Sequence, residues 1–119
     1  MNAVYVAVTG ATILATGAMA AGGLARATFV VKNAEEVHVG ASWVPLLGAL
    51  KAMGAIGLLL GLFGIPTVGT AAAAGLAAFF VAAICFHVRA GVLYNIAFPG
   101  FFLALAVASL IVSIRFGPS

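Results

Sequence analysis

The sequence predicts an all-α protein, a bundle of four transmembrane helices, and three observations lead to this prediction. Hydrophobic residues make up 66% of the 119 residues, whereas only 6% are charged. A soluble domain carries about 25% charged residues, so this chain is expected to face lipid over most of its outside. The apolar residues fall into four stretches, each near or above the length of about 20 residues that a helix needs to cross a bilayer. Four spans use about 80 residues, which leaves no room for a separate soluble domain.

The first span is expected from about Ala3 to about Val31, which is longer than a bilayer crossing needs. The helix is therefore expected to tilt or to project from the membrane, with Arg26 near its far end reaching the interface. Gly17-Ala18-Met19-Ala20 offers a signal-peptidase pattern, but no positively charged start precedes it and the apolar stretch continues past it. We therefore expect an uncleaved first helix.

The segment from Lys32 to Gly40 is the most polar part of the chain, with both acidic residues and one of the two histidines. It is expected to form a loop or a short surface helix between the first two spans. Four spans place both termini on one side and this segment on the other. Arg26, Lys32 and Arg89 lie on the side of the segment and Arg115 on the opposite side. The positive-inside rule then places the polar side in the cytoplasm and the termini outside.

The second span is expected over residues 44–63. Trp43 is an interfacial anchor, and the proline that follows at position 45 suits a first helical turn. Gly64-Ile65-Pro66 is expected to end the helix. Four glycines recur at spacings of three and four, so one helix face should let another backbone approach closely; they are Gly54, Gly57, Gly61 and Gly64.

The third span is expected over residues 68–89 and the fourth over residues 96–114. The third is narrow in its first half, which is rich in alanine and glycine, and wide in its second half, which contains three phenylalanines. A short turn from Gly91 to Asn95 should join the two spans.

Polar side chains gather at one membrane face, and this asymmetry is the strongest functional indication in the sequence. We predict catalytic roles for Glu36, His87, Lys51 and Arg89. We predict contacts to a substrate for Asn33, Glu35, His38, Trp43, Tyr94 and Asn95. The opposite face has almost no ionisable residue besides Arg115.

Lys51 lies six residues after Pro45, which is about 9 Å along a helix. An ionisable group at that depth costs a few kcal/mol unless it pairs or reaches the interface. Glu35 or Glu36 is the expected partner in a structural ion pair. The alternative is that Lys51 binds an anion, a carbonyl oxygen or a quinone oxygen.

His87 shares a helix face with Phe80, so it should point into the bundle if that residue does. It is expected to serve either as a structural hydrogen-bonding residue or in catalysis. Arg89 is two positions further on and faces another direction, as an interfacial anchor or a phosphate contact. Glu35 and Glu36 are adjacent and cannot both point inward, and we predict Glu36 as the inward acid or base.

Several kinds of chemistry are not expected. Cys85 is the single cysteine, which excludes an internal disulfide, and it is expected to be a small buried apolar residue. No HxxxH or CxxC spacing is present, so we predict no metal site, although His38 and His87 would be its ligands if they met beside a glutamate. The five basic residues are scattered, which argues against nucleic-acid binding.

Four segments together resemble the DoxX-like family of small four-helix membrane proteins. They are residues 46–51, residues 54–63, residues 71–76 and the Phe86-His87-Val88-Arg89-Ala90-Gly91 sequence. The resemblance implies a multi-pass protein of a bacterial inner membrane. Relatives in this family include subunits of a thiosulfate:quinone oxidoreductase, but no residue pattern here carries that activity over.

Three functions are consistent with these observations. In the first, a lipophilic small molecule enters from the lipid bilayer and is isomerised, cyclised or hydrolysed at the polar face without a cofactor. In the second, the chain is an accessory subunit that docks a quinone or a membrane oxidoreductase, as the resemblance and the glycine face suggest. The protein partners considered are an oxidoreductase subunit and a second copy of the chain in a homo-oligomer. In the third, it is a transporter component. The third ranks last because the charges cluster at one end and do not line a path.

Overall fold

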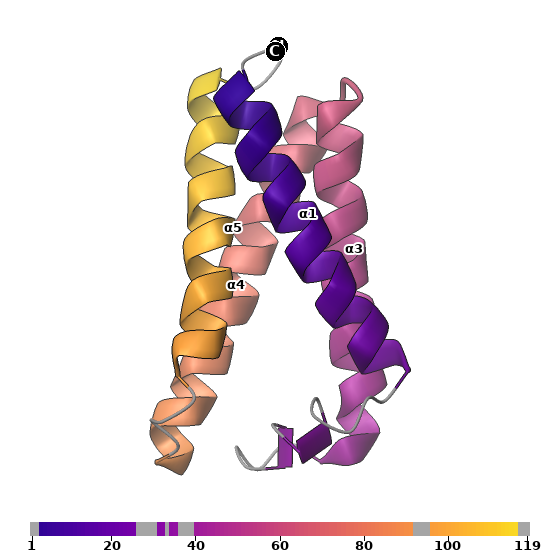
Figure 1. The fold of residues 1–119 in the computed structure, drawn as a ribbon, viewed down its shortest axis with the longest axis vertical. Helices are drawn as coiled ribbons and strands as arrows, with labels where there is room; N and C mark the ends of the chain where they lie inside the picture. Colours follow the sequence, from indigo (N-terminus) through magenta and orange to yellow (C-terminus); the bar gives the residue numbers. More distant parts are fainter. Residues whose placement is uncertain (1–2, 26–30, 33, 36–39, 92–95, 117–119) are drawn as a thin grey trace.

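The structure is a computed structural model, and it describes residues 3–25, 31–32, 34–35, 40–91 and 96–116. Four long helices follow one another in these ranges, with a short 3-10 turn before the second (Figure 1): α1 (Ala3–Leu24), η1 (Ala41–Trp43), α3 (Val44–Leu62), α4 (Pro66–Ala90) and α5 (Ala97–Phe116). None of the described residues forms a strand. The prediction of an all-α chain with four long helices is confirmed.

The helices are long and apolar. By length and composition, α1, α3 and α4 can each cross a bilayer, and α5, which is 20 residues long, contains the apolar segment Pro99–Arg115. Each helix also exposes large apolar side chains, among them Leu14, Met53, Val81 and Ile111. Lipid covers such side chains without the cost that water would impose.

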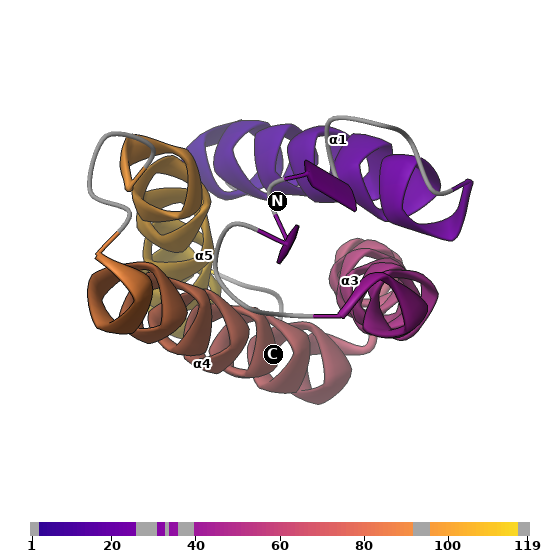
Figure 2. The ribbon, with the colours of Figure 1, turned by 90° about the horizontal axis from the view of Figure 1, so that it is seen from below.

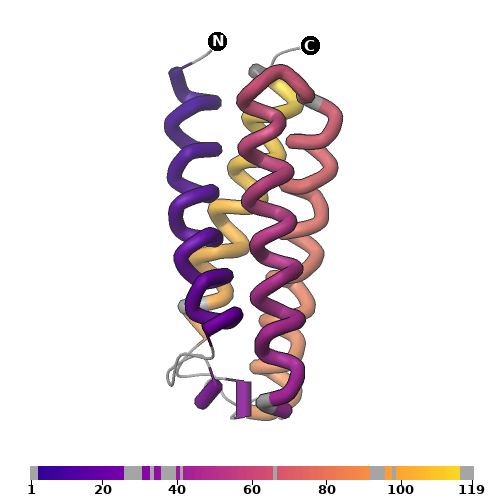
Figure 3. The backbone as a smooth tube through the Cα atoms, turned by 90° about the vertical axis from the view of Figure 1, so that its right-hand side faces the viewer, coloured from indigo at the N-terminus to yellow at the C-terminus, as the bar shows by residue number. Residues whose placement is uncertain are grey.

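The four helices form a ring in which each packs against two others. The helices α1 and α4 lie on opposite sides, and each contacts both α3 and α5 (Figure 2). The helix α1 runs obliquely across the other three (Figure 1). The start of α1 and the end of α5 lie at one end of the bundle, as expected for four antiparallel crossings (Figure 3). We call that the terminal end, and the end where α1 stops at Leu24 and α4 stops at Ala90 the polar end.

The first helix is shorter than expected, because α1 ends at Leu24 and not near Val31. Its last turn contains two adjacent glycines, which are poor helix formers. One of them, Gly23, packs against α3 so closely that a Cβ there would lie 3.0 Å from the Cα of Gly48. After the break, Ala34 is helical and packs against Val44 at the polar end. Of the segment from Lys32 to Gly40, which was expected to form a loop or a short surface helix, Lys32, Ala34 and Glu35 are helical, and Asn33 and residues 36–39 lie outside the described residues.

The helices α3, α4 and α5 begin and end within two residues of the expected spans. Pro66 does more than end α3, since it opens α4 in a first-turn position where a missing N–H costs nothing. Gly64, between them, has a φ of 106°, a left-handed conformation that favours glycine.

The glycine face of α3 packs inside the chain. A Cβ on Gly61 would lie 2.7 Å from the Cα of Gly69 on α4, and a Cβ on Gly57 would lie 2.6 Å from the Cβ of Ala72. A Cβ on Gly54 would lie 2.5 Å from Cδ2 of Leu76, which is one turn further along α4. The close approach predicted for this face is confirmed for these three glycines, whereas Gly64 is a turn residue. The face joins α3 to α4, so it is not free to dock another protein.

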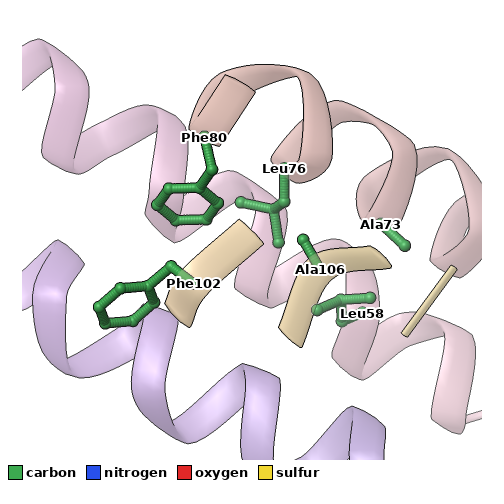
Figure 4. Packing of buried hydrophobic residues seen from close by; sticks show 6 residues of the cluster. All are labelled: Leu58, Ala73, Leu76, Phe80, Phe102 and Ala106. Atoms are coloured by element: carbon green, nitrogen blue, oxygen red, sulfur yellow. The ribbon is translucent and has the colours of Figure 1, made fainter. Parts of the chain in front are cut away.

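The apolar core lies between α3, α4 and α5 in the middle of the bundle (Figure 4): Leu58, Ala73, Leu76, Phe80, Phe102 and Ala106. The rings of Phe80 and Phe102 stack with their centroids 5.4 Å apart. Cys85 is exposed on the outer side of α4, so the expectation of a buried cysteine is wrong. In a membrane an apolar residue is equally at home on the lipid side and in the core.

Candidate functional site

Lys51 lies on the inward side of α3, in line with the buried residues Val44, Ala55 and Leu58. It is half-buried, and its Nζ lies 5.5 Å from the centre of the Phe79 ring on α4. A cation held over an aromatic face at this distance is attracted by the electron density of the ring. The interior of the bundle therefore contains an ammonium group, about 10 Å from the start of α3.

The expected carboxylate partner of Lys51 is not found among the described residues. Glu35 is exposed, and no ion pair joins it to Lys51. Glu36, the other predicted partner and the predicted acid or base, lies outside the described residues. Within the described chain, an aromatic ring and not a carboxylate accompanies the lysine.

His87 is only 3% exposed, and it shares the inward face of α4 with the buried Phe80. The inward orientation expected from the helical spacing is confirmed. Gly91, with a φ of 73°, closes α4 in the left-handed conformation common at helix C-termini. His87 is therefore held in the last turn of α4, at the polar end.

The two ring nitrogens of His87 differ in their surroundings. Nδ1 lies 2.8 Å from the carbonyl oxygen of Ala83, one turn earlier in α4. Nε2 is buried and has no hydrogen-bond partner among the described residues. The side chain is thus anchored at one nitrogen and unsatisfied at the other.

The remaining predicted residues do not join Lys51 and His87 in the interior. Arg89, Trp43 and Glu35 are all exposed, so they lie at the rim of the polar end. Arg89 faces away from His87, as its two-residue offset predicts. The other predicted residues fall outside the described ranges: Asn33, Glu36, His38, Tyr94 and Asn95. The described part of the site therefore consists of an interior lysine and histidine with an exposed rim.

The buried face of α1 carries hydroxyl groups that we did not predict. Tyr5, Thr9, Thr12 and Thr16 are all buried, at spacings of four, three and four residues. Thr12 Oγ1 lies 2.9 Å from the carbonyl oxygen of Val8 and 2.6 Å from Ser109 Oγ on α5. When Thr12 donates to Val8, Ser109 donates to Thr12. The helical spacing of these residues was visible in the sequence, and it marks the inward face of α1.

A second hydroxyl pair joins α4 to α5. Thr70 Oγ1 lies 2.6 Å from Ser113 Oγ, near the terminal end. Both pairs link neighbouring helices through interhelical hydrogen bonds, which stabilise packing in lipid by about 0.6 kcal/mol on average.

Three buried polar atoms have no hydrogen-bond partner in the described residues: Thr9 Oγ1, Thr16 Oγ1 and His87 Nε2. A threonine hydroxyl can rotate about χ1 to the carbonyl four residues earlier, as Thr12 does at 2.9 Å from Val8. The imidazole of His87 cannot satisfy Nε2 by a similar rotation, because the contact of Nδ1 with the carbonyl oxygen of Ala83 already fixes the ring. Of the three atoms, Nε2 of His87 is the one that needs a partner from elsewhere.

Metal ligands do not gather in the described part of the chain, where no three His, Cys, Asp or Glu side chains lie together. The hypothetical metal site required His38, which is outside the described ranges.

The chain matches the family model of the DoxX-like family over residues 7–109. No curated protein and no solved structure matches it.

Proposed function

Because the chain belongs to the DoxX-like family of membrane proteins, we propose that it binds a lipophilic small molecule at the polar end of its helix bundle. One observation carries the proposal: Lys51 lies on the inward side of α3, beside Phe79, with no carboxylate partner among the described residues. An uncompensated ammonium inside a membrane protein is costly, and such groups usually mark functional sites.

The residues around Lys51 suit a ligand with a hydrocarbon body and an oxygen function. The Phe79 ring beside Lys51 provides apolar surface, and it packs edge to face against the Phe80 ring of the core. The ammonium would bind a carbonyl oxygen or a developing oxyanion. His87 offers a nitrogen in the same half of the bundle.

Within this proposal the chemistry is acid/base catalysis without a cofactor. Isomerisation, cyclisation and hydrolysis all need a proton donor or acceptor and a group that stabilises an oxyanion. Glu36 and His87 are the proposed proton-transfer groups, Lys51 stabilises the oxyanion, and Arg89 orients the ligand at the rim. A quinone belongs to the same ligand class, because Lys51 would bind one of its carbonyl oxygens.

Recovery of the bound molecule tests the proposal. Wild-type protein and two variants would be purified in lipid nanodiscs, and their lipophilic extracts would be compared by mass spectrometry. Lys51→Met removes the inward charge and keeps the length of the side chain, whereas Lys32→Met removes an exposed charge and is the matched control. A specific molecule should be retained by the wild type and by Lys32→Met, and its amount should fall about tenfold in Lys51→Met. Equal retention by all three would contradict the proposal.

We further propose that the protein resides in a bacterial inner membrane with its polar end toward the cytoplasm. Lys32 and Arg89 lie at that end, and basic residues favour the cytoplasmic side. Single cysteines would be introduced in a Cys85→Ser background at two exposed positions, Ile65 at the terminal end and Gly40 at the polar end. A membrane-impermeant maleimide added to intact cells should label the cysteine at position 65 and spare the one at position 40. The opposite labelling would reverse the orientation.

A further inference from the structure

The hydrogen bond between His87 and Ala83 determines where the neutral imidazole carries its proton. A carbonyl oxygen can only accept, so the 2.8 Å contact with Nδ1 requires a hydrogen on Nδ1. The other nitrogen of a neutral imidazole is then a lone-pair acceptor. Nε2 of the neutral His87 is therefore a buried hydrogen-bond acceptor.

A buried acceptor without a donor is unfavourable, by about 1 to 3 kcal/mol. His87 is buried, and no described residue donates a hydrogen bond to Nε2. Lys51 also has donors on the inward side of the bundle, but its Nζ makes no hydrogen bond to the imidazole in the described chain and lies over Phe79. The described residues supply no donor for Nε2, and a bound molecule can supply one.

We infer that the ligand carries a hydroxyl group and donates it to His87 Nε2. This inference rests on the proposed function and narrows its ligand to lipophilic alcohols and phenols. Ethers, esters and oxidised quinones have only acceptors, so they satisfy Lys51 and leave Nε2 unpaired. A hydroquinone or a hydroxylated terpenoid-like molecule satisfies both groups.

The two polar groups thus make opposite demands on the ligand. Lys51 offers only donors and selects an oxygen acceptor, whereas His87 offers an acceptor and selects a donor. A molecule with both functions on an apolar body is recognised at two points. The hydrogen bond from Nδ1 to the carbonyl oxygen of Ala83 makes Nε2 the acceptor, because it fixes the tautomer of the neutral imidazole.

Two probes test the inference: 1-naphthol, which has a hydroxyl donor, and 1-methoxynaphthalene, in which a methyl group replaces the donor hydrogen. Their affinities would be measured with wild-type protein in lipid nanodiscs and corrected with empty nanodiscs. One hydrogen bond of ordinary strength corresponds to a preference of about 3- to 10-fold for naphthol. The variant His87→Phe keeps an aromatic ring without the acceptor, and its preference for naphthol should vanish.

A spectroscopic measurement keeps the test independent of the folding of that variant. The protein contains two histidines, so ¹⁵N-histidine labelling gives few signals, and His38→Gln assigns them. Without a probe, Nε2 of His87 should show the shift of an unprotonated nitrogen and Nδ1 that of a protonated one. Naphthol should move the Nε2 signal, and methoxynaphthalene should leave it in place.

Three results would overturn the inference, and they separate it from the proposed function. A proton on Nε2 in the free protein would remove its basis and leave the lipophilic site intact. Equal affinities and equal shifts for the two probes would do the same. Failure of both probes to bind the wild type would count against the lipophilic site itself, and the donor selectivity would fall with it.

Discussion

The interior polar groups of the two halves of this bundle differ in their hydrogen-bond partners. In the half near the terminal end, hydroxyls from neighbouring helices pair with each other, as Thr12 with Ser109 and Thr70 with Ser113. Thr9 Oγ1 in this half has no partner in the described residues, but its hydroxyl can rotate to the carbonyl oxygen one turn earlier. In the half near the polar end, Lys51 has only an aromatic ring beside it, and Nε2 of His87 has no partner in the described residues. Groups that satisfy each other hold helices together, whereas groups left open are available to a ligand. The comparison therefore separates a packing half from a binding half.

The largest effect on stability is expected at the closest backbone contact of the packing half. A Cβ on Gly61 would lie 2.7 Å from the Cα of Gly69, and backbone atoms cannot move aside cheaply. Gly61→Ala should lower the free energy of unfolding by about 2 kcal/mol, measured by denaturant titration in mixed micelles. Gly75→Ala is the control, since nothing lies within 4 Å of its Cβ position. Equal stability of the two variants would mean that α3 and α4 do not depend on this contact.

The opposite response is expected at Lys51. Lys51→Met should lower the affinity for the probe 1-naphthol about tenfold, or by about 1.4 kcal/mol, because it removes the charge that binds the oxygen of the ligand. Its free energy of unfolding should stay the same or rise, since an uncompensated charge leaves the membrane interior. Isothermal titration and the same denaturant titration would measure both quantities. A large loss of stability would show that the lysine has a structural role and that the two halves do not differ.

A smaller effect is expected for the hydroxyl pair of Thr12 and Ser109. Thr12→Val keeps the shape of the side chain and removes the hydroxyl, and it should cost about 1 kcal/mol of stability. Ligand affinity should not change. In the double variant with Ser109→Ala the costs should be less than additive, by about 0.5 kcal/mol or more. Strict additivity would indicate that the 2.6 Å contact contributes no coupling energy.

The smallest effect concerns the contact of Lys51 with Phe79. Phe79→Leu keeps an apolar side chain and removes the aromatic face below the ammonium. A double-mutant cycle with Lys51→Met should give a coupling of about 0.5 to 1 kcal/mol in the free energy of unfolding. A coupling of zero would mean that Phe79 serves only as an apolar wall.

The sequence was sufficient for the fold, because the shortage of charge and the length of the apolar stretches follow directly from the bilayer. It was less informative about which face of each helix points inward. Lipid and protein core are both apolar, so an apolar residue such as Cys85 gives no direction, and that prediction was wrong. The threonines of α1 were better markers of the inward face, since an inward hydroxyl can also bond to a neighbouring helix, as Thr12 does with Ser109.

The candidate site was predictable only in part. The spacing of His87 relative to Phe80 was enough to orient it, because a regular helix fixes the relative directions of its side chains. The surroundings of Lys51 were not predictable, since they depend on how α3 and α4 pack through Gly57 and Gly61. The tautomer of His87 depends on a local contact with Ala83 that no sequence pattern specifies. The roles of Glu36 and the other residues outside the described ranges stay predictions.

The placement of Ala3 and Phe116 at the same end of the bundle bears on how such a protein can be extended (Figure 3). A second copy joined head to tail would start on the side where the first one finishes. Both copies would then share one orientation, and their polar ends would open toward the same compartment. A tandem duplication would therefore place two such sites on one face of a membrane without any inverted repeat.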